Sequence, residues 1–201
     1  MITFKPVIED IKEYQRGNLP ENAIRLDAPH SIDEMLKKAA PIEAVLCIVL
    51  FLAMFIKTIV NHDLVIKPIA VVLGFIIGFL LQAVHELLHA VVYPKDANVT
   101  VGKLKGKLVF VALASFPISR QRFILMSLLP FVLGIIPLLA FVISPAEYKI
   151  VNGLMFEMAG MGMVSPYVDV FNVIIVLRQA RRIDKIIFLR MTCTKYVSRR
   201  Y

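Results

Sequence analysis

The segment "PIAVVLGFIIGFLLQAVHELLHAVVY", residues 68–93, decides how this chain folds. It has no charged residue before Glu86. An α-helix of this length rises about 39 Å, which exceeds the ~30 Å of hydrocarbon in a bilayer. The segment therefore predicts a transmembrane helix. Its second half raises a question, because two histidines and a glutamate are costly to place in apolar surroundings unless they have a function there.

Three further apolar segments have the same character, at about residues 42–60, 123–143 and 151–177. Each is long enough to cross the hydrocarbon region as a helix. Hydrophobic residues make up 58% of the chain, whereas soluble domains contain about 45–50% apolar residues. The sequence thus predicts an all-α integral membrane protein with about four transmembrane helices. Prolines inside the last two segments are tolerated where neighbouring helices or water satisfy the freed backbone groups.

Lysine and arginine mark one side of the membrane. They gather in the loop 94–122 and in the segment after residue 177, whereas the loops 61–67 and 144–150 carry one lysine each. Because cytoplasmic loops are enriched in these residues, we expect both termini and the middle loop in the cytoplasm, with the chain in the cell membrane. Topology and attraction to anionic lipid then explain the net charge of +8. No nucleic-acid partner is expected, because no nucleic-acid-binding motif accompanies the basic residues.

The chain divides by composition into three parts. Residues 1–41 form a polar head, in which Ser31 and Glu34 have the spacing of a capping box and predict an amphipathic helix at the membrane surface. Residues 42–178 form the four-helix membrane domain, and residues 179–201 form a basic cytoplasmic tail. The two cysteines lie far apart in the sequence, which indicates neither a disulfide framework nor a thiolate metal site.

The middle loop is rich in β-branched residues. Its stretch "NVTVGKLKGKLVFVALAS", residues 98–115, contains Gly102 and Gly106 beside its apolar runs. This pattern predicts a short β-hairpin between the second and third helices. Two roles stay open at this point. The hairpin is either a solvated linker or an edge strand that pairs with an extended substrate.

The motif "HELLH", residues 85–89, matches the pattern H-E-x-x-H. On a helix, residues four apart lie on one face, one turn from each other. His85 and His89 are therefore placed to bind one tetrahedral Zn²⁺. Glu86 lies beside them, where its carboxylate can take a proton from a water molecule that the metal activates. The motif predicts a zinc site with Glu86 as the catalytic base.

The face of the helix that carries the histidines also carries small residues. Gly74, Gly78 and Gln82 lie within about one quarter of the circumference from His85 and His89. A pair of glycines four residues apart lets another helix approach closely. We therefore expect this face to pack against a partner helix rather than lipid.

A catalytic zinc site keeps three protein ligands and one open position, so the motif needs a third ligand. Asp169 lies nine residues before Arg178, about 13 Å from the cytoplasmic end of its helix. By the same measure from Lys95, His85 and His89 lie about 15 and 9 Å deep. Because both helices run toward the cytoplasm, these depths favour Asp169 as the third ligand. The alternative is a structural hydrogen bond from Asp169 to a neighbouring helix.

The residues before Asp169 interrupt the last apolar segment. Ser165 suits the N-cap of a helix and Pro166 suits its first position. We expect an unwound stretch there, followed by a fresh helix that presents Asp169 in its first turns.

These motifs together resemble the site-2 protease class of intramembrane zinc metalloproteases. They more closely resemble a family of small four-helix membrane proteins described as candidate zincin peptidases. The resemblance rests on "HELLHAVVYP", "RQRFILMSLLPFV" and "GMVSPYVDVFNVIIVL", within about residues 65–180. It implies that His85, His89 and Asp169 bind zinc and that Glu86 acts as the base. Site-2 proteases carry an Asp-Gly pair at the aspartate, whereas Val170 follows here.

The expected function is a membrane zinc metalloprotease that cleaves a membrane protein or peptide. Gln82 and Asn172 are candidate donors to the oxyanion or to the substrate. One alternative is a zinc-binding membrane protein without protease activity, such as a scaffold or regulator. Another is a zinc hydrolase of a non-peptide amide, because the same metal, water and glutamate serve any acyl hydrolysis.

Overall fold

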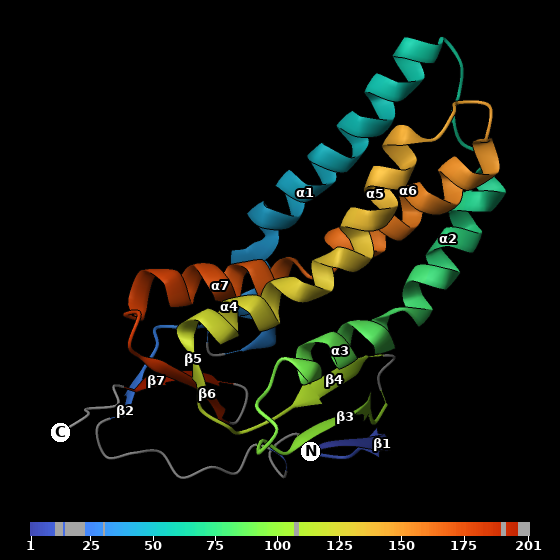
Figure 1. Cartoon of the computed structure of the whole chain (residues 1–201). Coiled ribbons are helices and arrows are strands. Elements are labelled where there is room, and N and C mark those ends of the chain that lie inside the picture. Colours follow the sequence, from blue (N-terminus) through green and yellow to red (C-terminus); the bar gives the residue numbers. More distant parts are fainter. Residues whose placement is uncertain (11–13, 15–22, 30, 107–108, 190–191, 197–201) are drawn as a thin grey trace. The chain divides into compact units, whose positions relative to one another are not determined.

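A computed structural model describes residues 1–10, 14, 23–29, 31–106, 109–189 and 192–196 (Figure 1). The chain forms two compact units, and each combines segments that are distant in the sequence. The first unit contains Met1–Met35, Ala83–Leu129 and Asp169–Tyr201, and the second contains Leu36–Gln82 and Pro130–Val168.

The described residues are mostly helical, and four helical stretches are long and apolar enough to cross a membrane: Asp33–Asn61, Pro68–Val91, Arg120–Ile143 and Lys149–Gln179. They coincide with the four apolar segments of the sequence. The helices within them are α1 (Ile32–Asn61), α2 (Pro68–Leu80), α3 (Gln82–Val91), α4 (Arg120–Leu128), α5 (Val132–Ile143), α6 (Lys149–Met163) and α7 (Tyr167–Gln179).

Three of these stretches are interrupted. Leu81 separates α2 from α3, and a 3-10 turn at Leu129–Phe131 separates α4 from α5. Residues 164–166 separate α6 from α7, so that Asp169 lies in the first turn of α7. The expected break before Asp169 is therefore confirmed. Proline occupies the second and third interruptions, where it cannot donate the hydrogen bond that would continue the helix.

The expected surface helix of the polar head is not separate from the first apolar segment. Ser31 Oγ accepts a hydrogen bond from the Glu34 N–H at 3.1 Å, so the predicted N-cap is present. From there α1 runs without a break for 30 residues, with Pro41 inside it. A single proline removes one backbone hydrogen bond, and a helix of this length continues through it.

In the second unit, glycine residues allow the helices to pack closely against each other. Helix α6 contacts both α2 and α5. A Cβ atom on Gly74 would lie 2.7 Å from the Leu154 oxygen, and one on Gly78 would lie 2.6 Å from Met161 Cβ. Neither position has room for a side chain, so α2 approaches α6 at backbone distance. The expectation that these two glycines face a partner helix is confirmed.

A lysine side chain caps the C-terminal carbonyl groups of α5 in the same unit. Lys57 Nζ donates to the carbonyl oxygen of Phe141, to that of Ser144 at 2.7 Å, and to Asn152 Oδ1 at 2.9 Å. The last carbonyl groups of a helix have no partner within the helix, and a cation there is favourable. Asn152 is fully buried. This arrangement explains a charged residue near the end of an apolar helix.

The first unit contains a three-stranded sheet in the order β1-β3-β4, formed by β1 (Ile2–Ile8), β3 (Val99–Leu104) and β4 (Phe110–Leu113). Strands β3 and β4 are antiparallel, with Val101 opposite Ala112, which confirms the predicted hairpin. Strand β1 adds in parallel on the other side of β3. Among the described strands, β4 is thus an edge of this sheet.

A second sheet in the first unit has the order β2-β7-β6-β5. Its strands are β2 (Ala23–Arg25), β5 (Ile118–Ser119), β6 (Lys185–Leu189) and β7 (Thr192–Tyr196). The expectation of an all-α protein with one hairpin was therefore too narrow, since strands from both ends of the chain pair across long sequence separations. Residues 190–191 and 197–201 of the expected tail lie outside the described residues. Ile118, Phe123, Val176 and Ile186 join this sheet to α4 and α7 in one apolar core.

The contact between α5 and α6 predicts a specific loss of stability. A Cβ atom on Gly134 would lie 2.4 Å from the Met163 backbone nitrogen, which cannot move without shifting the helix. Gly134→Ala should lower the free energy of unfolding by on the order of 1–3 kcal/mol. Gly160→Ala is the control, because its Cβ would meet a flexible side-chain atom, Leu50 Cδ2, at 3.3 Å. Thermal unfolding in detergent measures both, and equal stability of the two variants would contradict the packing.

Candidate metal centre

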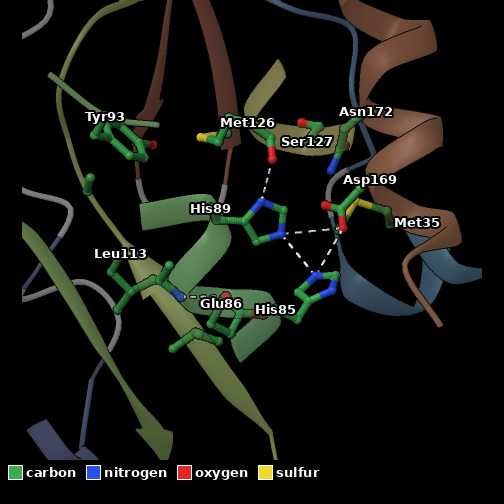
Figure 2. Close-up of a pocket in the computed structure, with 13 residues that line it drawn as sticks. Met35, His85, Glu86, His89, Tyr93, Leu113, Met126, Ser127, Asp169 and Asn172 are labelled. Carbon is green, nitrogen blue, oxygen red and sulfur yellow. Dashed lines mark hydrogen bonds and ion pairs between the residues drawn. The ribbon is translucent and has the colours of Figure 1, made fainter. Parts of the chain in front are cut away.

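Helix α3 presents two histidines toward one point. His85 and His89 are one helical turn apart, and their Nε2 atoms lie 3.0 Å from each other (Figure 2). The rings meet edge to face, with centroids 4.7 Å apart. His85 is buried, with 6% of its surface exposed. The spacing of the motif has therefore produced the pair of adjacent ring nitrogens that the sequence predicted.

Helix α7 brings a carboxylate to the same point. Asp169 Oδ2 lies 3.5 Å from the Nε2 atoms of both His85 and His89. All three residues belong to the first unit. Their ligand atoms lie within 4.8 Å of one another, as a group that could hold a metal ion. The structure thus brings Asp169 next to the two histidines.

The distances fit a tetrahedral zinc ion. Bonds of about 2.0–2.1 Å from a tetrahedral centre place ligand atoms roughly 3.3 Å apart. The three separations here are 3.0, 3.5 and 3.5 Å. Two imidazole nitrogens and one carboxylate oxygen also match the donor types that zinc prefers, and three protein ligands leave a position open.

The hydrogen bond of His89 determines which ring nitrogen faces the others. Its Nδ1 lies 2.8 Å from the backbone oxygen of Met126. A carbonyl oxygen can only accept, so Nδ1 carries the hydrogen and Nε2 of the neutral ring presents a lone pair. A lone pair that faces a carboxylate oxygen is unfavourable without a positive charge between them. Either a proton on Nε2 or a bound metal ion supplies that charge.

The Glu86 carboxylate lines the same cavity as this group but has its own partner. Its Oε2 accepts a hydrogen bond from the Ala112 N–H at 2.7 Å, so strand β4 holds the carboxylate (Figure 2). Glu86 is not among the three residues whose ligand atoms cluster. The glutamate of the motif therefore lies beside the candidate ligands without being one of them, as a catalytic base requires.

A cavity of about 270 Å³ adjoins the three ligands and Glu86. Four consecutive residues of the strand region, 111–114, line it, together with Asn172 of α7 and Ser127 of α4. Met35, from the start of α1, and Met126 also line it, and the sequence did not indicate either. Met35 belongs to a polar head with no site motif. The backbone oxygen of Met126 contacts His89, and no residue type signals a backbone contact.

The two predicted donors differ in their surroundings. Asn172 lies one turn after Asp169 and lines the cavity. Gln82 belongs to the second unit, where its Nε2 donates to Ser165 Oγ at 3.1 Å. The Ser165 hydroxyl in turn donates to the Met161 carbonyl at 2.6 Å. The Ser165 side chain therefore satisfies a carbonyl at the C-terminal end of α6. It does not act as the N-cap of α7 that the sequence suggested.

Comparison with known proteins relates the chain to a protein family. Residues 78–183 match the family described as "Putative zincin peptidase". The matched segment contains α3 and α7 and hence both halves of the candidate site. No curated protein and no solved structure matches the chain.

Metal content tests the ligand set. Purified protein should hold one zinc ion per chain, and His85→Ala and Asp169→Ala should each reduce zinc retention at least about tenfold, because each removes one of three ligands. Glu157→Ala is the control, since Glu157 lies on α6 in the second unit. Elemental analysis after dialysis measures the content. Full zinc in Asp169→Ala would remove that residue from the ligands.

Proposed function

The chain belongs to the family described as "Putative zincin peptidase", whose model it matches over residues 78–183. We propose that it is a membrane-embedded zinc metallopeptidase. The main support for the proposal is that the ligand atoms of His85, His89 and Asp169 form a triangle. The Glu86 carboxylate lies next to this triangle and is not part of it. In this arrangement three residues bind the metal and a fourth, Glu86, transfers the proton. Metal-assisted hydrolysis of a peptide bond uses both roles.

The residues divide the chemistry between them. Zinc held by the three ligands would supply a Lewis acid that polarises the scissile carbonyl and lowers the pKa of water. Glu86 Oε2 is held by the Ala112 N–H. Its Oε1 is then the atom that takes the proton of the attacking water and returns it to the leaving amine. Asn172, on the cavity wall, donates from Nδ2 to the oxygen of the substrate carbonyl.

The substrate binds as an extended chain along β4. A helix hides its amide groups in its own hydrogen bonds, so the scissile segment must unwind before hydrolysis. The cavity is lined by four consecutive residues, 111–114, although alternate side chains of a strand point to opposite faces. The backbone edge of β4 therefore borders the cavity, and the Ala112 N–H is directed toward Glu86. An added peptide strand would pair with the backbone groups of this edge that the Glu86 contact leaves available.

The bilayer surrounds the second unit in this proposal. Its helices expose large apolar side chains, among them Phe51, Phe55, Val72 and Phe75, each between 49% and 59% exposed. Large exposed apolar surfaces indicate contact with another apolar phase. We further propose that the chain lies in the cell membrane with both termini in the cytoplasm. The basic residues of the loop 94–122 and of the C-terminal segment then face anionic lipid.

Two other functions share part of this evidence. A zinc-binding scaffold needs a closed site with four ligands, whereas three ligand residues and an adjoining cavity favour a site that admits a substrate. A hydrolase of a non-peptide amide would use the same metal and base. The backbone edge beside the cavity favours a peptide, because a strand edge recognises main-chain amides.

A substitution of Glu86 tests whether this residue is the catalytic base. Glu86→Gln keeps the shape and the contact with β4 but cannot accept a proton. Cleavage should fall by a factor of about 10²–10⁴, the usual contribution of a general base, while zinc content stays at the wild-type level. Glu157→Gln, in the second unit, is the matched control and should keep full activity. Retained proteolysis in Glu86→Gln would rule out this base.

Binding along β4 predicts an alternating pattern in the substrate. A cleaved peptide is first found by screening extended apolar sequences, and its backbone nitrogens are then methylated one at a time. Methylation should raise KM roughly fivefold to tenfold at every second residue, since alternate N–H groups point toward the paired strand and each hydrogen bond contributes about 1 kcal/mol. The intervening positions are the control. A uniform response along the peptide would argue against strand pairing.

A further inference from the structure

We propose that Pro130 is a positioning residue of the metal centre, because the N–H that it lacks leaves the Met126 carbonyl available to hold His89. The inference rests on the proposed zinc site. It concerns how the ligand ring is oriented, and it does not depend on which bond the enzyme hydrolyses.

Helix geometry determines which donors compete for the Met126 carbonyl. In an α-helix, the carbonyl of residue 126 accepts from the N–H of residue 130, and in a 3-10 turn it accepts from residue 129. Residue 130 is proline and has no N–H. The N–H of Leu129 donates to the Leu125 oxygen instead. Neither helical donor therefore occupies the Met126 carbonyl.

The interruption of the helix falls at the same place. Helix α4 ends at Leu128, and the chain continues as the 3-10 turn Leu129–Phe131. Met126 is buried, with 6% of its surface exposed. A buried carbonyl without a partner is costly, typically about 1–3 kcal/mol. The released oxygen of Met126 thus needs a donor from another element.

His89 provides that donor. Its Nδ1 lies 2.8 Å from the Met126 oxygen, across 37 residues of sequence (Figure 2). The bond fixes the tautomer with hydrogen on Nδ1, and it turns Nε2 toward His85 and Asp169. Partners of this kind orient a ligand and raise its basicity, and their loss costs about 10–100-fold in metal affinity. Pro130 does not contact the ligand ring in this proposal. It acts indirectly, because it leaves the Met126 carbonyl available to His89.

Restoring the missing N–H tests the proposal. In Pro130→Ala, the new N–H can donate to the Met126 oxygen and compete with His89. Zinc affinity, measured by competition with a chelator, should fall about 10–100-fold. The ¹⁵N NMR shifts of the His89 ring in the zinc-free protein should move toward a mixture of tautomers. Pro137→Ala is the matched control, because Pro137 lies inside α5 and its helical acceptor is the carbonyl of Leu133.

A second variant separates the N–H from the proline ring. Replacement of Pro130 by lactic acid, Pro130→lactic acid, has the side chain of alanine but an ester oxygen in place of the N–H. It should keep the zinc affinity and the ring shifts of the wild type. Equal losses in the alanine and ester variants would assign Pro130 a role in helix shape alone and overturn the proposal, as would an unchanged affinity in Pro130→Ala. Zinc binding without any peptidase activity in the wild type would refute the proposed function and leave this inference standing.

Discussion

The candidate site depends on one unfavourable contact, the convergence of three electron-rich atoms in largely buried surroundings. His85 Nε2, His89 Nε2 and Asp169 Oδ2 lie within 3.5 Å of one another. Without a proton or a metal ion between them these atoms repel, so the surrounding structure has to hold each of them in place. Helix α3 fixes the two rings at a spacing of one turn, and the start of a new helix fixes the aspartate. The breaks in the apolar segments are therefore part of the site.

The features that the sequence predicted are local or periodic. The two histidines follow from helical spacing, and the glycine face follows from the same period. Asp169 was predicted because a carboxylate in an apolar segment is rare and because its distance from the end of its segment matches that of the histidines. The hairpin of β3 and β4 follows from β-branched residues around glycine. Each of these signals lies within about 20 residues, where pattern and propensity dominate.

The features that the sequence did not predict depend on contacts between distant segments. Strand β1 is interrupted by Pro6, and its parallel pairing with β3 joins residues almost 100 positions apart. Strands β6 and β7 lie in a segment whose basic residues suggested a plain tail. The Met126 carbonyl belongs to the backbone and has no residue type of its own, although Pro130 marks its position. Met35 reaches the cavity from a head that carries no site motif.

The order of the strands along the chain has a consequence for biosynthesis. Strand β2 pairs with β7, so the sheet of the first unit that contains them joins residues near 24 to residues near 195. Asp169 lies between α6 and these last strands. A nascent chain that contains only the first two apolar helices already carries both histidines and Glu86, but it has neither Asp169 nor strand β7. The candidate metal centre can therefore assemble only after most of the chain has been synthesised.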